Sequence, residues 1–197
     1  MSEVLKLQII VGSVRKGRLS NRVGAWVNNE AAKLDGVEAE VVDLADYPLP
    51  IFDEAGSPQF TPDRQPEGAV KQWLDKLAEA DAYVIVTPEY NRSTSGALKN
   101  ALDYVAFELE KKPVAFVAHG STGGAGAVSH LRGILPQLLS VTVPQATYFS
   151  DRAAEHISED GQLSEELQGK PYGPLTALTS TLESTVWYGN ALKAARG

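Results

Sequence analysis

Residues 87–103 read TPEYNRSTSGALKNALD, and this stretch decides the fold. The apolar run AYVIV at residues 82–86 precedes it and predicts a buried strand. From residue 97 to residue 105, apolar residues recur at helical spacing and predict a helix. In α/β proteins, a polar turn between a strand end and a helix start is where ligands bind. We therefore expect a ligand site here, and we call residues 87–95 the second loop.

Two other strand-to-helix junctions resemble it. The first loop is GSVRKGRLSN at residues 12–21, and the third loop is HGSTGGAG at residues 119–126. Because the carboxyl ends of parallel strands meet at the same edge of a sheet, we expect the three loops to form one site.

Length, charge and cysteine content restrict the function. The 197 residues suffice for one domain with a full core and are short for two. A formal net charge of −7 gives no electrostatic support for a nucleic-acid partner, although a local helix terminus or arginine can still bind an anionic cofactor. The sequence contains no cysteine, which excludes disulfides, thiol catalysis and thiolate metal sites.

The sequence also predicts a soluble, cytoplasmic protein with no membrane partner. Its start, Met1-Ser2-Glu3, leads directly into a predicted strand without the pattern of a signal peptide. No apolar run approaches the ~18 residues that a membrane span requires.

Strands and helices alternate along the chain. We predict strands at residues 4–11, 37–44, 82–87, 113–118 and 141–148. Helices are expected at 20–34 with Ser20 as N-cap, 69–78, 97–105, 128–139 with Gly133 and Pro136 shortening it, and 174–195. This alternation predicts a doubly wound α/β fold: a five-stranded parallel sheet in the flavodoxin-like order 2-1-3-4-5, with helices on both faces. An unrelated α/β domain of similar rhythm is the alternative.

We expect residues 1–197 to form a single domain with two irregular segments. The proline-rich loop at residues 45–66 contains five prolines and cannot be regular throughout, so it is functional, disordered or packed against another subunit. Residues 150–173 are polar, acidic and weakly patterned, which predicts a surface excursion.

The loops offer groups for an anionic, heterocyclic ligand. Ser13, Arg15, Ser20 and Asn21 suit a phosphate monoester at a helix N-terminus, although the loop lacks the Walker and GxGxxG patterns. A capped helix with a solvated basic loop explains them equally well. Glu89, Tyr90 and Asn91 can supply an acceptor, an aromatic plane and an amide, or form an ordinary turn. The glycines of the third loop let backbone N–H groups approach a ligand, or simply permit a turn.

Other catalytic machinery has little support. The histidines, His119, His130 and His156, are scattered and have no metal-ligand spacing. Only His119 can reach the site, either as a ligand contact or as a hydrogen-bond partner behind it. Serines 13 and 121 lack the GxSxG elbow of hydrolases, and Lys99 with Asp103 fits an ion pair on one helix face.

Taken together, the motifs resemble the NADPH-dependent FMN reductase family, flavodoxin-like enzymes that include quinone, azo-dye and chromate reductases. The resemblance spans roughly residues 4–150, and Ser95 stands where many members have proline. Its matching residues are Gly12-Ser13-x-Arg15 with Ser20-Asn21, Pro88-Glu89-Tyr90-Asn91, and Gly96-x-Leu98-Lys99-Asn100-x-x-Asp103.

The resemblance implies three groups of cofactor-binding residues. FMN phosphate would be held by Ser13, Arg15, Ser20 and Asn21. The ribityl chain and the ring would be lined by Pro88, Glu89, Tyr90 and Asn91, and the ring would be contacted from the other side by Ser121, Thr122, Gly123 and Gly124. The family is usually dimeric or tetrameric, which makes the proline-rich loop and the helix at 97–105 a predicted interface of a homodimer or homotetramer.

The implied reaction is a ping-pong hydride transfer from NADPH or NADH through FMN to a small acceptor, such as a quinone, free flavin, an azo compound or chromate. FMN carries this chemistry, so no catalytic side chain and no metal are expected. The first alternative is a flavodoxin-type FMN electron carrier that does not oxidise NAD(P)H directly. The second is a regulatory or scaffold protein that uses the fold for partner binding.

Overall fold

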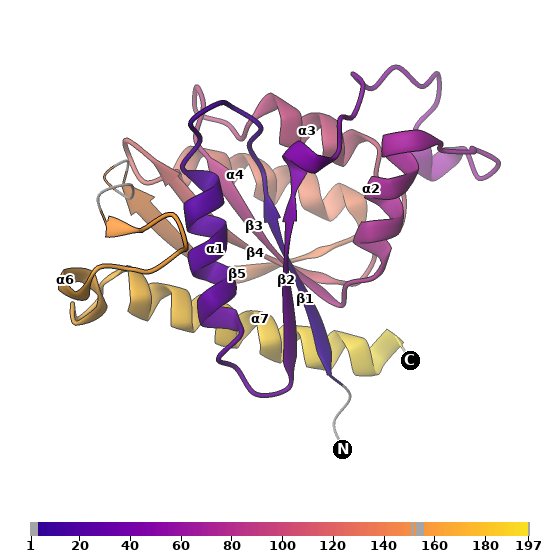
Figure 1. Ribbon diagram of the computed structural model, residues 1–197. Helices are drawn as coiled ribbons and strands as arrows, with labels where there is room; N and C mark the ends of the chain where they lie inside the picture. The colour runs from indigo at the N-terminus through magenta and orange to yellow at the C-terminus, as the bar shows by residue number, and fades with distance from the viewer. Residues whose placement is uncertain (1–3, 151, 153–155, 197) are drawn as a thin grey trace.

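The structure, a computed structural model, describes residues 4–150, 152 and 156–196. Its five strands form one parallel sheet in the order β2-β1-β3-β4-β5, which confirms the predicted topology (Figure 1). The strands are β1 (Leu5–Val11), β2 (Val37–Asp43), β3 (Ala82–Pro88), β4 (Pro113–Gly120) and β5 (Val141–Ser150).

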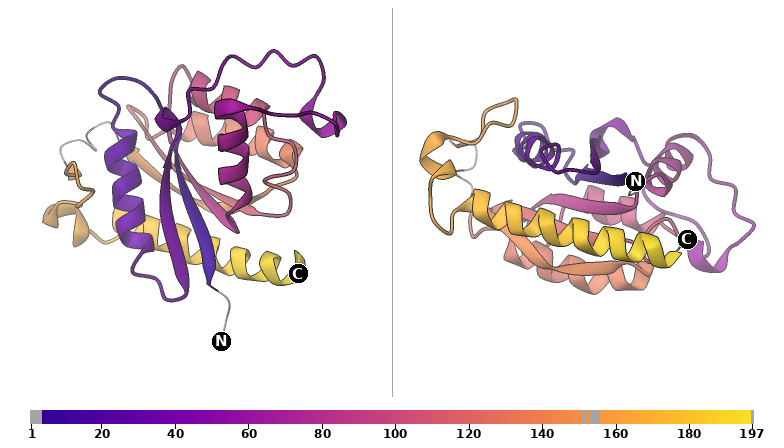
Figure 2. Two further views of the ribbon diagram at one scale, coloured as in Figure 1. Left: turned by 45° about the vertical axis from the view of Figure 1, so that its right-hand side comes forward. Right: turned by 90° about the horizontal axis from the view of Figure 1, so that it is seen from below.

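Helices cover both faces of the sheet. Helices α1 and α7 pack on one face, and α2, α3 and α4 pack on the other (Figure 2). The bounds are α1 (Ser20–Ala31), α2 (Gly68–Ala78), α3 (Gly96–Asp103), α4 (Ala125–Ile134), α6 (Glu165–Gln168) and α7 (Pro174–Arg196). The 3₁₀ turns are η1 (Leu44–Asp46), η2 (Pro58–Phe60) and η3 (Leu135–Leu138).

Alternating side chains of the central strands supply both cores. In β3, Val84 and Val86 pack toward α1 and α7, whereas Tyr83 and Ile85 pack toward α2 and α3. Every residue of β3 is buried, and so is every residue of β4. A strand buried on both faces reads as a continuous apolar run, which is why the sequence predicted these strands well.

Two helix ends test the predictions from single residues. The expectation that Ser20 caps α1 is wrong by one residue, because Leu19 occupies the N-cap position and Ser20 begins the helix. At the end of α4 the prediction is confirmed: the helix stops at Ile134 and the chain continues as η3, whose second residue is Pro136. Proline lacks the N–H that an α-helix needs, so the helix tightens there.

The segment after β5 is more than a surface excursion. Ile157, Leu163 and Leu167 are buried in the same hydrophobic core as the inward-facing residues of α1 and α7, which corrects the prediction for this segment. Gly161 has a φ of +78° and lies so close to α1 that a Cβ would meet the backbone nitrogen of Trp26 at 2.4 Å. Scattered apolar residues without periodicity gave no signal of this packing. Residues 151 and 153–155 of the predicted segment lie outside the described residues.

The proline-rich loop is tied to α3 and its C-terminal end. The Asn100 side chain accepts the Phe52 N–H at 2.8 Å and donates to the carbonyl oxygen of Pro50 at 2.7 Å. Arg64 donates to the carbonyl oxygen of Tyr104 at 2.7 Å. These bonds give the loop a defined position along α3, from its middle to its C-terminal end.

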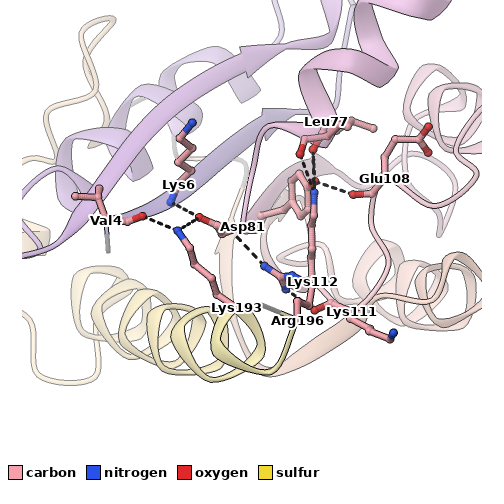
Figure 3. A network of polar contacts seen from close by, with 11 residues as sticks. Val4, Lys6, Leu77, Asp81, Glu108, Lys111, Lys112, Lys193 and Arg196 are labelled. Carbon is pink, nitrogen blue, oxygen red and sulfur yellow. Dashed lines mark hydrogen bonds and ion pairs between the residues drawn. The ribbon is translucent and has the colours of Figure 1, made fainter. Parts of the chain in front are cut away.

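A polar network joins the C-terminal end of α7 to the amino-terminal ends of β1 and β3 (Figure 3). Lys193 donates to the Asp81 carboxylate at 2.8 Å, and the Lys6 N–H donates to it at 3.0 Å, while Arg196 lies 3.4 Å away. Partial burial alone would raise the pKa of Asp81. The hydrogen bonds and the positive charges of Lys193 and Arg196 outweigh the burial and lower that pKa.

We expect Asp81→Asn to destabilise the protein by about 1–2 kcal/mol at pH 7, because it removes the charge from these hydrogen bonds. A carboxylate with a lowered folded pKa stabilises the fold above its unfolded pKa of about 4 and loses that contribution as the pH falls through the folded value. Urea unfolding of both proteins from pH 7 to pH 2.5 measures this. The difference should shrink toward acid pH, and a constant difference would contradict the assignment. Asp75→Asn, at an exposed pair with Lys71, is the control.

Candidate functional site at the carboxyl edge of the sheet

The first and second loops are in direct contact, as expected. The hydroxyl groups of Ser13 and Tyr90 are 3.1 Å apart. Ser95 donates its hydroxyl to the carbonyl oxygen of Gly12 and also accepts the Leu98 N–H at 3.0 Å. Ser95 is therefore the N-cap of α3 as well as a link between the loops. A serine can do both at this position, where proline has no hydroxyl to offer.

The third loop joins the other two. The Glu89 N–H donates to the carbonyl oxygen of His119 at 2.8 Å, which links the second and third loops. Ser20 Oγ lies 2.8 Å from His119 Nε2, which links the first and third loops. The structure thus brings all three predicted loops together at one edge of the sheet, at the top of Figure 1.

The second loop turns sharply at residues 90–93. Tyr90 and Ser93 exchange two backbone hydrogen bonds of 2.8 and 3.0 Å. Between them Asn91 and Arg92 have φ values of 51° and 67°, the pattern of a type I′ hairpin turn. Both side chains are exposed at the rim of the site. Asparagine tolerates this left-handed conformation well, whereas arginine adopts it at a cost in energy.

Glycine is required in the third loop. Gly123 and Gly124 have φ values of 84° and 87°. A Cβ on Gly124 would lie 2.6 Å from the Cβ of Ala118, so no larger residue fits. Ser121 and Thr122 are exposed before these glycines. The loop therefore presents backbone and two hydroxyl side chains at the surface of the site.

A cavity of about 240 Å³ lies where the three loops meet. No side chain among the described residues caps α1, and its first turn contains no acidic residue, so the positive end of the helix dipole is available to an anion. The guanidinium of Arg15 lies 5.3 Å from the centre of the Tyr90 ring. The lining residues are Arg15, Arg18, Leu19, Pro88, Glu89, Tyr90, His119 and Gly120.

The predicted residues occupy four kinds of position. Four of them, Arg15, Pro88, Glu89 and Tyr90, line the cavity. Ser13 and Ser20 are buried behind it, with hydroxyl partners in Tyr90 and His119. The exposed residues around it are Asn21, Asn91, Ser121 and Thr122, and the turn glycines are Gly123 and Gly124.

Arg18 was not among the predicted site residues. It lines the cavity and forms an ion pair with Asp43, the last residue of β2. The predicted strand order could have indicated this ion pair. β2 lies beside β1, so a carboxylate at the end of β2 is near the first loop, which follows β1. His119 was weighed only as a ligand contact or a supporting partner. It lines the cavity, and its Nε2 lies 2.8 Å from Ser20 Oγ, so it faces the cavity and also contacts the start of α1.

The sequence model of a family described as NADPH-dependent FMN reductase matches residues 5–155. The chain belongs to this family. This membership confirms the resemblance drawn from the three loops and identifies the protein as an oxidoreductase of an FMN- and NAD(P)H-dependent family. Among the described residues no helix is long and apolar enough to cross a membrane, and no three His, Asp or Glu side chains gather as metal ligands.

Relatives of this FMN reductase family support the assignment. An NAD(P)H-dependent FMN reductase, C4B3.06c, from Schizosaccharomyces pombe is 36% identical over 155 residues, covering 77% of this chain and 78% of its own. An FMN-dependent NADPH-azoreductase from Staphylococcus aureus is 36% identical over 164 residues, covering 80% and 82%. The structure of FerB, a flavoenzyme NAD(P)H:(acceptor) oxidoreductase from Paracoccus denitrificans, matches with a TM-score of 0.71 at 26% identity, over 95% of this chain and 98% of that one.

Proposed function

We propose that the protein binds FMN at the three loops and transfers hydride equivalents from NAD(P)H to a small acceptor in a ping-pong reaction. The supporting observation is the cavity between the loops, lined by two arginines of the loop that precedes α1, in a member of the FMN reductase family. Quinones, free flavin, azo compounds and chromate are the proposed acceptors. The name of the Staphylococcus aureus relative supports an azo compound.

The residues present fit the phosphate end of FMN. A phosphate monoester needs N–H donors and positive charge. The start of α1, which no described side chain caps, offers the N–H donors, and Arg15 and Arg18 offer the charge, although Arg18 also pairs with Asp43. In this proposal Ser13, Ser20 and Asn21 complete or support the phosphate site.

The other two loops fit the flat part of the cofactor. The second loop offers Pro88, Glu89, Tyr90 and Asn91 along the ribityl chain and the ring. From the other side the third loop offers the exposed Ser121 and Thr122, together with the turn glycines Gly123 and Gly124. When bound, FMN supplies the hydride chemistry, and the protein binds it, orients it and leaves a surface for substrates.

The primary test is the visible absorption spectrum. Protein saturated with FMN and desalted should keep a flavin spectrum, and anaerobic NADPH or NADH should bleach it. Retained flavin that neither nucleotide bleaches would favour the electron carrier instead. Colourless protein would contradict the proposed site and favour a regulatory or scaffold role.

Arg15→Ala should weaken FMN binding, because it removes a charge-assisted contact of about 1.5–3 kcal/mol to the phosphate. That corresponds to a dissociation constant roughly 10- to 150-fold higher in a fluorescence titration. Lys16→Ala is the matched control, since Lys16 is an exposed cation of the same loop that does not line the cavity. Equal affinities of the two variants would argue against Arg15 as a phosphate ligand.

We also propose a homodimer or homotetramer whose interface includes the proline-rich loop and α3. Ile51 and Phe60 on that loop are 80% and 85% exposed, although the loop itself is tied to α3. Phe60 borders a cavity of about 670 Å³ that reaches α3 and α4. Exposed apolar side chains beside a hollow are typical of an interface.

Light scattering should give a mass of two or four chains, and Phe60→Asp with Ile51→Asp should shift it toward one chain. A monomeric wild-type protein at working concentration would contradict the interface. The cytoplasmic location stays a prediction.

A further inference from the structure

We propose that Glu89 is a positioning residue whose carboxylate fixes the third loop against the second, so that the surface facing the flavin is formed before the cofactor binds. The inference deepens the proposed function and rests on it for its consequence in FMN binding. The sequence predicted that the Glu89 side chain contacts the heterocycle, whereas this inference gives the side chain a contact within the protein.

The carboxylate is turned into the protein. The Glu89 side chain is 8% exposed, and its Oε2 accepts the Gly126 N–H at 2.7 Å. Gly126 is the second residue of α4, so this N–H is among those that a helix cannot satisfy internally. The negative charge also lies at the positive end of the helix dipole, where it is stabilising.

The start of α4 has no local substitute for this contact. Its N-cap residue is Gly124, which has no side chain, and its first turn contains no acidic residue. Helices commonly obtain this cap from Ser, Thr, Asp or Asn at the N-cap position. Here Glu89 supplies it from 37 residues earlier in the chain, and the cap therefore joins two loops as well as completing a helix.

Two glycines make room for the carboxylate. A Cβ on Gly126 would lie 3.1 Å from Cδ and Oε2 of Glu89, and a Cβ on Gly120 would lie 3.1 Å from its Cβ. Both distances are shorter than ordinary van der Waals contact. The third loop thus fits closely around the Glu89 side chain on two sides.

A second contact reinforces the same connection. Ser93 Oγ lies 2.5 Å from Nδ1 of His130, a residue of α4, and the Arg92 guanidinium lies 3.7 Å from Glu89 Oε1. The type I′ turn is therefore held to α4 on both sides of its tip. With Glu89 in place, the spacing between the turn and the third loop is set by the protein alone.

The test compares Glu89→Ala, Glu89→Gln and the wild-type protein. Glu108→Ala is the matched control, because Glu108 Oε2 also accepts a backbone N–H, that of Ala106, at 2.7 Å, away from the three loops. The first measurement is amide hydrogen exchange of residues 120–128 in the FMN-free protein. The second is the dissociation constant of FMN by fluorescence titration.

Glu89→Ala should speed exchange of the Gly126 amide and raise the FMN dissociation constant, each about tenfold or more, since a hydrogen bond to a buried charge is lost. Glu89→Gln should restore much of both, because its amide oxygen can accept the same N–H. The control should change neither.

An FMN dissociation constant of Glu89→Ala within about twofold of wild type would overturn the inference. So would weaker FMN binding with unchanged exchange in the FMN-free protein, because that result identifies Glu89 as a direct ligand. If the wild-type protein does not bind FMN, the proposed function fails. The exchange measurement then decides the inferred contact by itself: faster exchange in Glu89→Ala supports the contact, and unchanged exchange overturns the contact.

Discussion

Every residue of β3 and β4 is buried, so these strands need a neighbouring strand on each side and helices on both faces. Each parallel strand runs from the amino edge of the sheet to its carboxyl edge, so a crossover connection must carry the chain back to the amino edge before the next strand. The turns that begin these crossovers consequently gather at the carboxyl edge. Burial of the two central strands thus places the three loops together, although they are separated by many residues in the sequence.

The site uses two helix N-termini in different ways. The start of α1 has no side-chain cap among the described residues and lies beside Arg15 and Arg18, which favours an external anion. The start of α4 is already capped by the carboxylate of Glu89. In the proposed FMN complex, this difference would orient the cofactor, with its phosphate at α1 and its uncharged ring near α4. A protein of net charge −7 can bind an anionic cofactor because these local fields act over a few ångströms.

The two ends of the sheet have separate tasks. At the carboxyl edge, polar groups and tight turns form a cavity, and Arg92 accepts a costly backbone conformation. At the opposite edge, Asp81 joins β1 and α7 through charged hydrogen bonds. Stability and ligand binding can therefore be altered by substitutions that lie far apart.

Secondary structure and strand order were predictable because hydrophobic periodicity and buried apolar runs are local properties of the sequence. The motifs of the three loops are also short, local stretches of sequence, and they were sufficient to assign the family. Details at helix ends were less predictable. Serine is a residue type favoured at N-caps, yet the hydroxyl of Ser20 lies 2.8 Å from His119 inside the protein. Ile157 and Leu163 carry no periodic signal, and their burial depends on the surface that α1 and α7 present.

The sequence by itself therefore determined the doubly wound fold, the three loops and the family. Only the tertiary structure decided that Arg18 pairs with Asp43, that Glu89 caps a helix 37 residues away, and that the proline-rich loop is held by Asn100. Each of these contacts joins segments distant in sequence at a few ångströms. Their geometry follows from how the strands and helices pack, which residue spacing along the chain does not specify.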